Sequence, residues 1–126
     1  MFSHIMVGAN DIETSRKFYD AVLGALGVSA GAADPKGRVW WATDKGRFGI
    51  SLPIDGEAAS CANGGTIGFA APTPELADAF HAAGLAHGGT AIEDPPGRRD
   101  GPFGALHLAY LRDPAGNKVV AVHRLG

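Results

Sequence analysis

Cysteine is almost absent from this sequence, and long apolar runs are missing altogether. The single Cys61 excludes an internal disulfide and a zinc site built from cysteines, which suits a reducing compartment. No apolar stretch approaches the roughly 18 residues that a membrane span requires, and the N-terminus lacks the basic start of a signal peptide. We therefore expect a cytoplasmic protein with no membrane partner.

The chain also lacks an excess of either charge. Lys and Arg number 11 against 13 Asp and Glu, a net charge of −2, with no obvious run of one sign. A domain that binds nucleic acid normally carries a basic patch or stripe. We therefore expect no nucleic-acid partner.

Glycine, by contrast, is abundant, at 19 of 126 residues. That is roughly twice ordinary usage, and it indicates many tight turns. Apolar residues make up 45% of the chain, enough for a real core. The length suits one domain and is too short for two independent ones.

The residue pattern repeats once along the chain as a strand, a helix and three strands. At an offset of 62 residues, Phe18 aligns with Phe80 and Leu23 with Leu85, at matching phases of two predicted helices. The first helix is expected from a cap at Asn10 to about residue 24, and the second from Thr73–Pro74 to Gly88–Gly89. The predicted strands are residues 2–7, Val28, 38–42, 47–53, 65–71, 106–112 and 118–123, and residues 94–102 form a loop rich in proline and glycine.

This order predicts an α+β fold in which a helix packs on one face of each sheet. A four-stranded sheet covered by a single helix keeps apolar surface exposed. Each unit therefore needs its twin or a second chain, and we expect a homodimer.

The opening strand carries His4, Asp11 precedes a helix with Phe18–Tyr19, an apolar strand covers residues 66–71, and the turn 113–117 has the sequence Asp-Pro-Ala-Gly-Asn. Together these features resemble the vicinal oxygen chelate superfamily, which contains glyoxalase I, extradiol dioxygenases and bleomycin-resistance proteins. The family usually has Asp where this chain has Ala115. The resemblance implies one domain, residues 1–126, made of two βαβββ modules at about 1–57 and 64–126. Their curved mixed sheets would surround a concave cavity.

The family's enzymes hold one divalent metal ion with four inward side chains, one from each of four strands. Carried over to this sequence, the first position is His4 and the second falls near Gly49 or Ser51. The third falls on Thr66 and the fourth on Val120. Catalytic metal sites keep about three protein ligands. Because only His4 is a plausible ligand, we predict that the family's metal site is lost and that no cofactor is bound.

We expect a metal-free pocket for a small organic molecule, lined by His4, Trp40, Thr66, His107 and Tyr110. Trp40 and Trp41 are adjacent in a strand, so one should face the cavity and the other should pack under a helix. His4 and His107 could together supply a general base near neutral pH.

Two other functions stay open at this point. His107 with His4 and His123 could rebuild a metal site, giving a metal-dependent lyase or dioxygenase with relocated ligands. The chain could also sequester a drug, as bleomycin-resistance proteins do, although a net charge of −2 gives little support for a cationic ligand. Cys61 has no base near it in sequence and is taken as non-catalytic.

Overall fold

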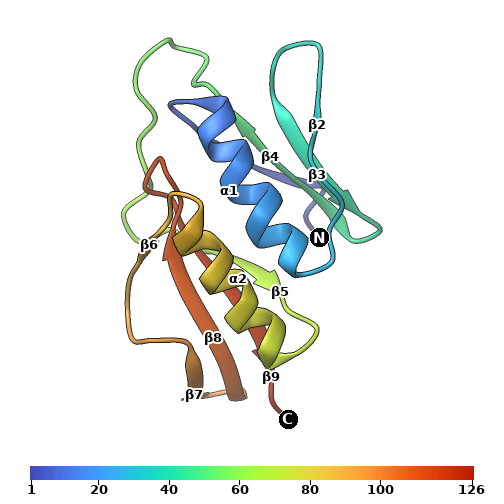
Figure 1. The fold of residues 1–126 in the computed structure, drawn as a ribbon, viewed down its shortest axis with the longest axis vertical. Helices are drawn as coiled ribbons and strands as arrows, with labels where there is room; N and C mark the ends of the chain where they lie inside the picture. The colour runs from blue at the N-terminus through green and yellow to red at the C-terminus, as the bar shows by residue number, and fades with distance from the viewer.

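The computed structural model describes all 126 residues, and it contains two modules that each begin with a strand and a helix and continue with further strands (Figure 1). The first module consists of β1 (His4–Gly8), α1 (Ile12–Ala25), β2 (Ala32–Ala33), β3 (Val39–Thr43) and β4 (Gly46–Ser51). Its sheet has the order β1-β4-β3-β2, with β1 parallel to β4 and the other neighbours antiparallel.

The second module repeats this arrangement and adds one strand. It consists of β5 (Ile67–Ala70), α2 (Pro74–Ala86), β6 (Thr90–Ala91), β7 (Gly97–Gly101), β8 (Gly104–Arg112) and β9 (Lys118–Arg124). The sheet has the order β5-β9-β8-β6, β5 is parallel to β9, and β7 pairs with β8. The α+β fold with two mixed sheets is therefore confirmed.

The structure corrects three local predictions. Val28 is not in a strand, and a two-residue β2 follows it at Ala32–Ala33. Residues 97–101, predicted as loop, form β7, because their backbone pairs with β8 although Arg98–Asp100 shows no apolar alternation. The cap of α1 is Asp11, whose carboxylate accepts from the Thr14 amide at 2.9 Å, while the Asn10 side chain accepts from the Ala59 amide.

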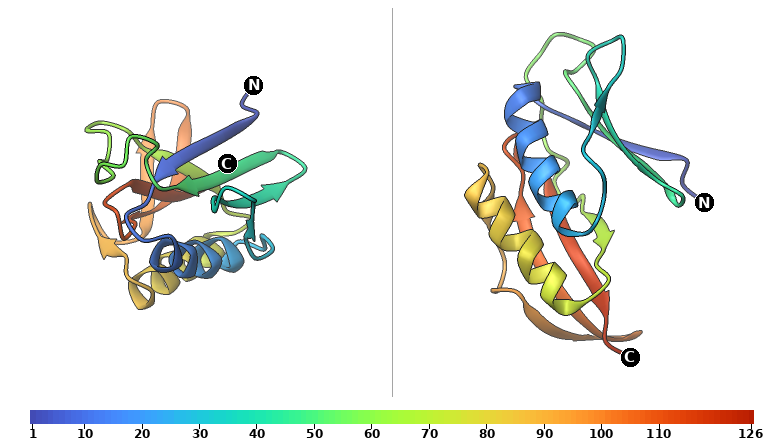
Figure 2. Two further views of the ribbon diagram at one scale, coloured as in Figure 1. Left: turned by 90° about the horizontal axis from the view of Figure 1, so that it is seen from above. Right: turned by 45° about the vertical axis from the view of Figure 1, so that its right-hand side comes forward.

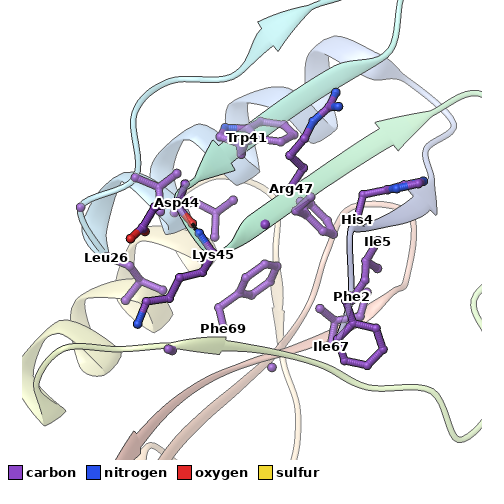
Figure 3. A pocket seen from close by; sticks show the side chains of 18 of the residues that line it. Phe2, His4, Ile5, Leu26, Trp41, Asp44, Lys45, Arg47, Ile67 and Phe69 are labelled. Carbon is purple, nitrogen blue, oxygen red and sulfur yellow. Dashed lines mark hydrogen bonds between the residues drawn. The ribbon is translucent and has the colours of Figure 1, made fainter.

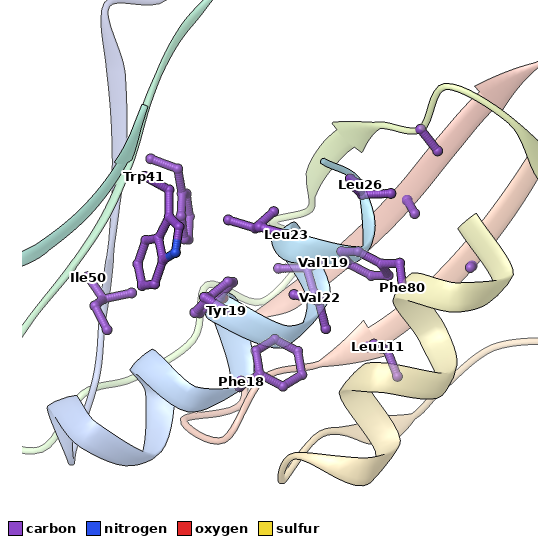
Figure 4. Packing of buried hydrophobic residues seen from close by; sticks show 14 of the residues in the cluster. Phe18, Tyr19, Val22, Leu23, Leu26, Trp41, Ile50, Phe80, Leu111 and Val119 are labelled. Carbon is purple, nitrogen blue, oxygen red and sulfur yellow. The ribbon is translucent and has the colours of Figure 1, made fainter. Parts of the chain in front are cut away.

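The two helices pack side by side on one side of the sheets (Figure 2). Phe18 on α1 and Phe80 on α2, which the repeat aligns, are both fully buried. They belong to one core that joins both modules (Figure 4). Neither helix is long and apolar enough to cross a membrane.

The turn at residues 113–117 ties the modules together through a buried polar network. The Tyr19 hydroxyl on α1 donates to Asp113 Oδ2 at 2.6 Å. Asp113 also accepts from the backbone and side chain of Asn117, whose amide donates to the Gly8 carbonyl at the end of β1. Burial and the neighbouring Asp113 carboxylate raise the pKa of Tyr19 well above its usual value, so it stays a neutral donor.

Candidate functional site

Strand alternation decides which side chains of the first sheet can meet a ligand. Trp41 points toward α1, where its ring lies 5.5 Å from that of Tyr19 and its Nε1 donates to Asp20 at 2.9 Å. Trp40, the neighbouring residue in the strand, therefore lies on the opposite face of the sheet. We call the face of a sheet that is turned away from its helix the open face. The strand register places His4, Arg47 and Gly49 on this same open face.

Trp40 is held on the open face by a hydrogen bond to Asp34, and its ring has room there because Gly49 has no side chain. Its Nε1 donates to Asp34 Oδ2 at 3.1 Å, and Asp34 also binds Arg38. Its ring lies over Gly49, where an added Cβ would come within 2.6 Å of the ring. Partial desolvation would raise the pKa of Asp34, but hydrogen bonds from Trp40 and Arg38 outweigh it and lower the pKa to about 2.

Three side chains contact the ring of this indole. One is Arg38, whose guanidinium carbon lies 5.6 Å from the ring centroid while the same group binds Asp34. The guanidinium carbon of Arg47 lies 4.3 Å from the centroid of the Trp40 ring, a cation–π contact. The His4 ring meets Trp40 edge-on, with centroids 5.7 Å apart, and its Nδ1 is 2.8 Å from Ser3 Oγ. We call His4, Trp40 and Arg47 the first-sheet cluster.

Thr66, Tyr110 and Val120 belong to the second module. Tyr110 and Val120 are directly paired on the open face of the second sheet, and Gly68 of β5 is their neighbour in register. The Lys118 ammonium lies 4.9 Å from the Tyr110 ring centroid and pairs with Glu93, whose pKa it lowers. Thr66 precedes β5 and is exposed.

His107 lies on the opposite face from Tyr110. Its Nε2 is 2.8 Å from Asp78 Oδ1 on α2, so it faces the helix. The structure therefore does not bring His107 and His4 into one pocket. His123 is also turned toward the helix side, with Nδ1 2.8 Å from the Ala71 carbonyl oxygen.

The alternative of a metal site made by His4, His107 and His123 is wrong for this reason. No group of three or more His, Cys, Asp or Glu side chains lies close enough together to hold a metal ion.

The family's own metal positions do not fit a divalent ion either. Arg47 stands opposite His4 in the register, Gly49 opposite Met6 and Ser51 opposite Gly8, so β4 offers no carboxylate. The Trp40 ring fills the space that a side chain at Gly49 would need. Thr66 and Val120, the residues to which the resemblance carries the other two ligand positions, supply no imidazole or carboxylate, and the positive charge of Arg47 beside His4 opposes binding of a cation.

A cavity of about 570 Å³ lies on the other side of this sheet, between its helix face and β5 (Figure 3). Its volume is in the range of small-molecule sites. His4 and Arg47 border it, but their side chains point away from Phe69 (Figure 3). Its walls are mainly apolar and include Leu23, Leu26, Trp41, Phe48, Ile67 and Phe69. Sequence reasoning left the aromatic residues open between cavity wall and core, because apolar residues that line a pocket look the same in a sequence as residues of the core.

Comparison with known proteins agrees with this fold. A family profile described as Glyoxalase/Bleomycin resistance protein/Dioxygenase superfamily matches residues 1–121. The crystal structure of a glyoxalase/bleomycin resistance protein from Albidiferax ferrireducens T118 is 59% identical, with a TM-score of 0.96, and the match covers 98% of this chain and 99% of that one. No curated protein matches.

More distant structures share the fold alone. A glyoxalase/bleomycin resistance protein/dioxygenase family enzyme from Burkholderia phytofirmans PsJN is 21% identical, with a TM-score of 0.72 and 98% of each chain covered. A lactoylglutathione lyase from Agrobacterium tumefaciens is 19% identical, with a TM-score of 0.65 and coverage of 98% of this chain and 92% of that one. The profile match and the close structural relative together show that this chain belongs to the glyoxalase/bleomycin resistance protein/dioxygenase superfamily.

Proposed function

We propose that this protein binds a small organic molecule at the first-sheet cluster without the help of a metal ion. The observation that supports this most is the position of Trp40. Its ring lies over Gly49 on the open face, to which the resemblance assigns the family's metal ligands. An aromatic surface there offers dispersion and stacking contacts in place of coordination bonds. His4 adds a polar ring at its edge.

The remaining predicted pocket residues keep different parts in this proposal. Thr66 and Tyr110 are candidates to contact a ligand from the open face of the second sheet. His107 is left out of the binding site, because its imidazole is engaged by Asp78 on the helix side. Trp40 would contact the ligand on the open face of the first sheet, whereas Trp41 lies on the helix face.

A drug-sequestering function for large cationic ligands has less support. No Asp or Glu occupies a strand position on the open face of either sheet, whereas Arg47, Arg99, Arg112, Lys118 and Arg124 do. A cationic drug would meet like charge there. Calorimetric titration with bleomycin is expected to give no binding heat.

Metal removal tests the proposal directly. Protein freed of metal with EDTA is expected to bind members of a set of small aromatic fragments, detected by ligand-observed NMR. Replacing Trp40 by Ala should weaken that binding, whereas the matched Trp41→Phe variant, altered on the helix side, should retain it.

Titration of the same protein with Zn²⁺, Ni²⁺, Mn²⁺ and Fe²⁺ gives the opposing outcome. Stoichiometric tight binding of one of these ions that disappears in His4→Ala, together with fragment binding only after metal loading, would contradict metal-free binding. Fragment binding that depends on Trp41 and not on Trp40 would instead place the ligand in the apolar cavity.

A further inference from the structure

Arg47 differs from every other arginine in this protein, because its guanidinium has no hydrogen-bond or ion-pair partner. Arg38 and Arg98 bind the carboxylates of Asp34 and Asp100. The other four arginines donate to backbone carbonyl oxygens: Arg16 to Gly31, Arg99 to Asp94 and Pro95, Arg112 to Gly116, and Arg124 to Phe103. Arg16 also pairs with the carboxylate of Asp20. The Arg47 guanidinium lies against the Trp40 ring and makes no hydrogen bond or ion pair within the chain, so its N–H donors are unused.

Arg47 is nevertheless held in place. Its guanidinium lies over an indole that is itself fixed by Asp34 at 3.1 Å and by the backbone of Gly49. A planar guanidinium stacked on an aromatic ring has lost part of its side-chain freedom before any ligand arrives. Ordering it on binding therefore costs less than ordering a free surface arginine.

The surroundings of Arg47 are suited to negative charge. His4 is its direct partner on the neighbouring strand, and the Nε2 atom of that ring has no hydrogen-bond partner within the chain. The carboxylate that binds Trp40, that of Asp34, is already bound by Arg38 at 2.6 Å. An anion on this open face thus meets an unpaired guanidinium, an imidazole and no acidic side chain from a strand position.

We propose that the first-sheet cluster recognises a small organic carboxylate with an aromatic or apolar body, through the fork of Arg47 with His4 beside it. This inference rests on the proposed function, since it names the ligand class for the same cluster. Guanidinium and carboxylate are both planar and form two parallel charge-assisted hydrogen bonds. The body of the ligand would lie on the part of Trp40 that remains exposed. A permanent side-chain cation would then stand where the family's enzymes use a metal cation to bind oxygens.

Three probes of one shape and different charge test this ligand class. 1-Naphthoate, 1-naphthamide and 1-naphthylmethylamine are titrated by calorimetry into EDTA-treated protein at low salt. Naphthoate is expected to bind at least about tenfold more tightly than the amide, because hydrogen bonds between charged groups are stronger than those to neutral groups. The amine is expected to bind more weakly than both, because its positive charge meets that of Arg47. Added salt should weaken naphthoate binding and leave the amide unchanged.

Variants assign the preference to Arg47. Arg47→Gln is expected to remove the tenfold preference for naphthoate over the amide, and Arg47→Lys to retain only part of it. Arg98→Gln is the matched control, because it removes an exposed arginine on the helix side of the second sheet and should change neither affinity. Circular dichroism and thermal melting establish that each variant is folded. If Arg47→Gln does not fold, the salt dependence and Arg47→Lys still decide the question.

The outcomes separate this inference from the proposed function. Equal binding of naphthoate and naphthamide, both weakened by Trp40→Ala, would overturn the carboxylate preference and leave metal-free binding standing. A preference that survives Arg47→Gln would overturn the role of Arg47. Absence of naphthoate binding to the metal-free protein overturns the inference, and absence of binding by every aromatic fragment overturns the proposed function as well.

Discussion

Tyr19 shows how a single hydroxyl connects the two modules. It is fully buried on α1, and its ring packs against Trp41 and Phe48 of the first sheet. Its hydroxyl meanwhile reaches Asp113 in the turn that precedes the last strand. A buried carboxylate needs all its donors, because its desolvation is compensated only by hydrogen bonds. The turn is therefore a structural link, and its resemblance to a family motif reports the fold more than a reaction.

Replacing Tyr19 by Phe is expected to lower the free energy of unfolding by about 1–3 kcal/mol, because a buried oxygen of Asp113 loses its donor. Urea denaturation followed by fluorescence measures the change. Tyr110→Phe is the control, since the Tyr110 hydroxyl makes no hydrogen bond within the chain, and it should stay within about 0.5 kcal/mol of the wild type. Equal stabilities for the two variants would show that the Tyr19–Asp113 bond contributes nothing measurable.

The sequence could not predict on which face of its strand His107 lies. The strand 106–112 has apolar residues at both parities, with Leu106 and Leu108 on one and Ala109 and Leu111 on the other. Alternation alone therefore cannot say which face His107 takes. The contact with Asp78, 29 positions away, settles it in the structure.

At the scale of elements, two glycines in the helices serve opposite purposes. Gly84 on α2 faces the core, where an added Cβ would lie 2.3 Å from Leu111 Cδ1 and 3.1 Å from atoms of Phe18 and Val22. Gly24 near the end of α1 has no atom within 4 Å of that position. The first allows α2 to approach α1 and β8 closely, and the second only lowers helix propensity.

The same substitution should therefore change stability in opposite directions at these two positions. Gly84→Ala is expected to lower the free energy of unfolding by about 1–3 kcal/mol through overpacking. Gly24→Ala should raise it by about 0.5 kcal/mol, because alanine favours the helix and restricts the unfolded chain. Thermal and urea denaturation of both variants measure the effects. A stabilising Gly84→Ala would mean that the contact between the helices relaxes at no cost.

Element prediction from sequence worked where apolar periodicity or capping chemistry was strong. The Thr73 side chain caps α2 and accepts from the Leu76 amide at 3.1 Å, with Pro74 in its first turn. It failed at β7, which is held by backbone pairing with β8 and carries Arg98, Arg99 and Asp100. Backbone pairing leaves no pattern in the side chains.

For the whole molecule, one chain leaves much of its sheets uncovered. The edge strands β1 and β5 are each paired on one side only. Large apolar side chains such as Phe2, Ile54 and Phe103 are more than two-thirds exposed. Free strand edges and exposed apolar side chains of this kind favour association.

We therefore expect a homodimer, with twice the 12.9 kDa mass of the chain in light scattering at micromolar concentration. If the interface is small, dilution should dissociate the dimer, and the average mass measured by light scattering should then decrease toward that of one chain. A constant mass of one chain across the micromolar range would contradict the dimer and would leave the exposed apolar residues without a partner. The cation titration described for the proposed function should be run at the same protein concentration.

The sequence by itself determined the two-module α+β fold, because the repeat places Phe18 and Phe80 at the same phase of two amphipathic helices. The resemblance read from the sequence also carries two of the family's metal positions onto threonine and valine, and that remains a prediction. Only the tertiary structure decided which side chains lie around His4. Which tryptophan faces outward, the lack of a partner for Arg47, and the separation of His107 from His4 all depend on strand register and on contacts between distant segments, which local patterns do not encode.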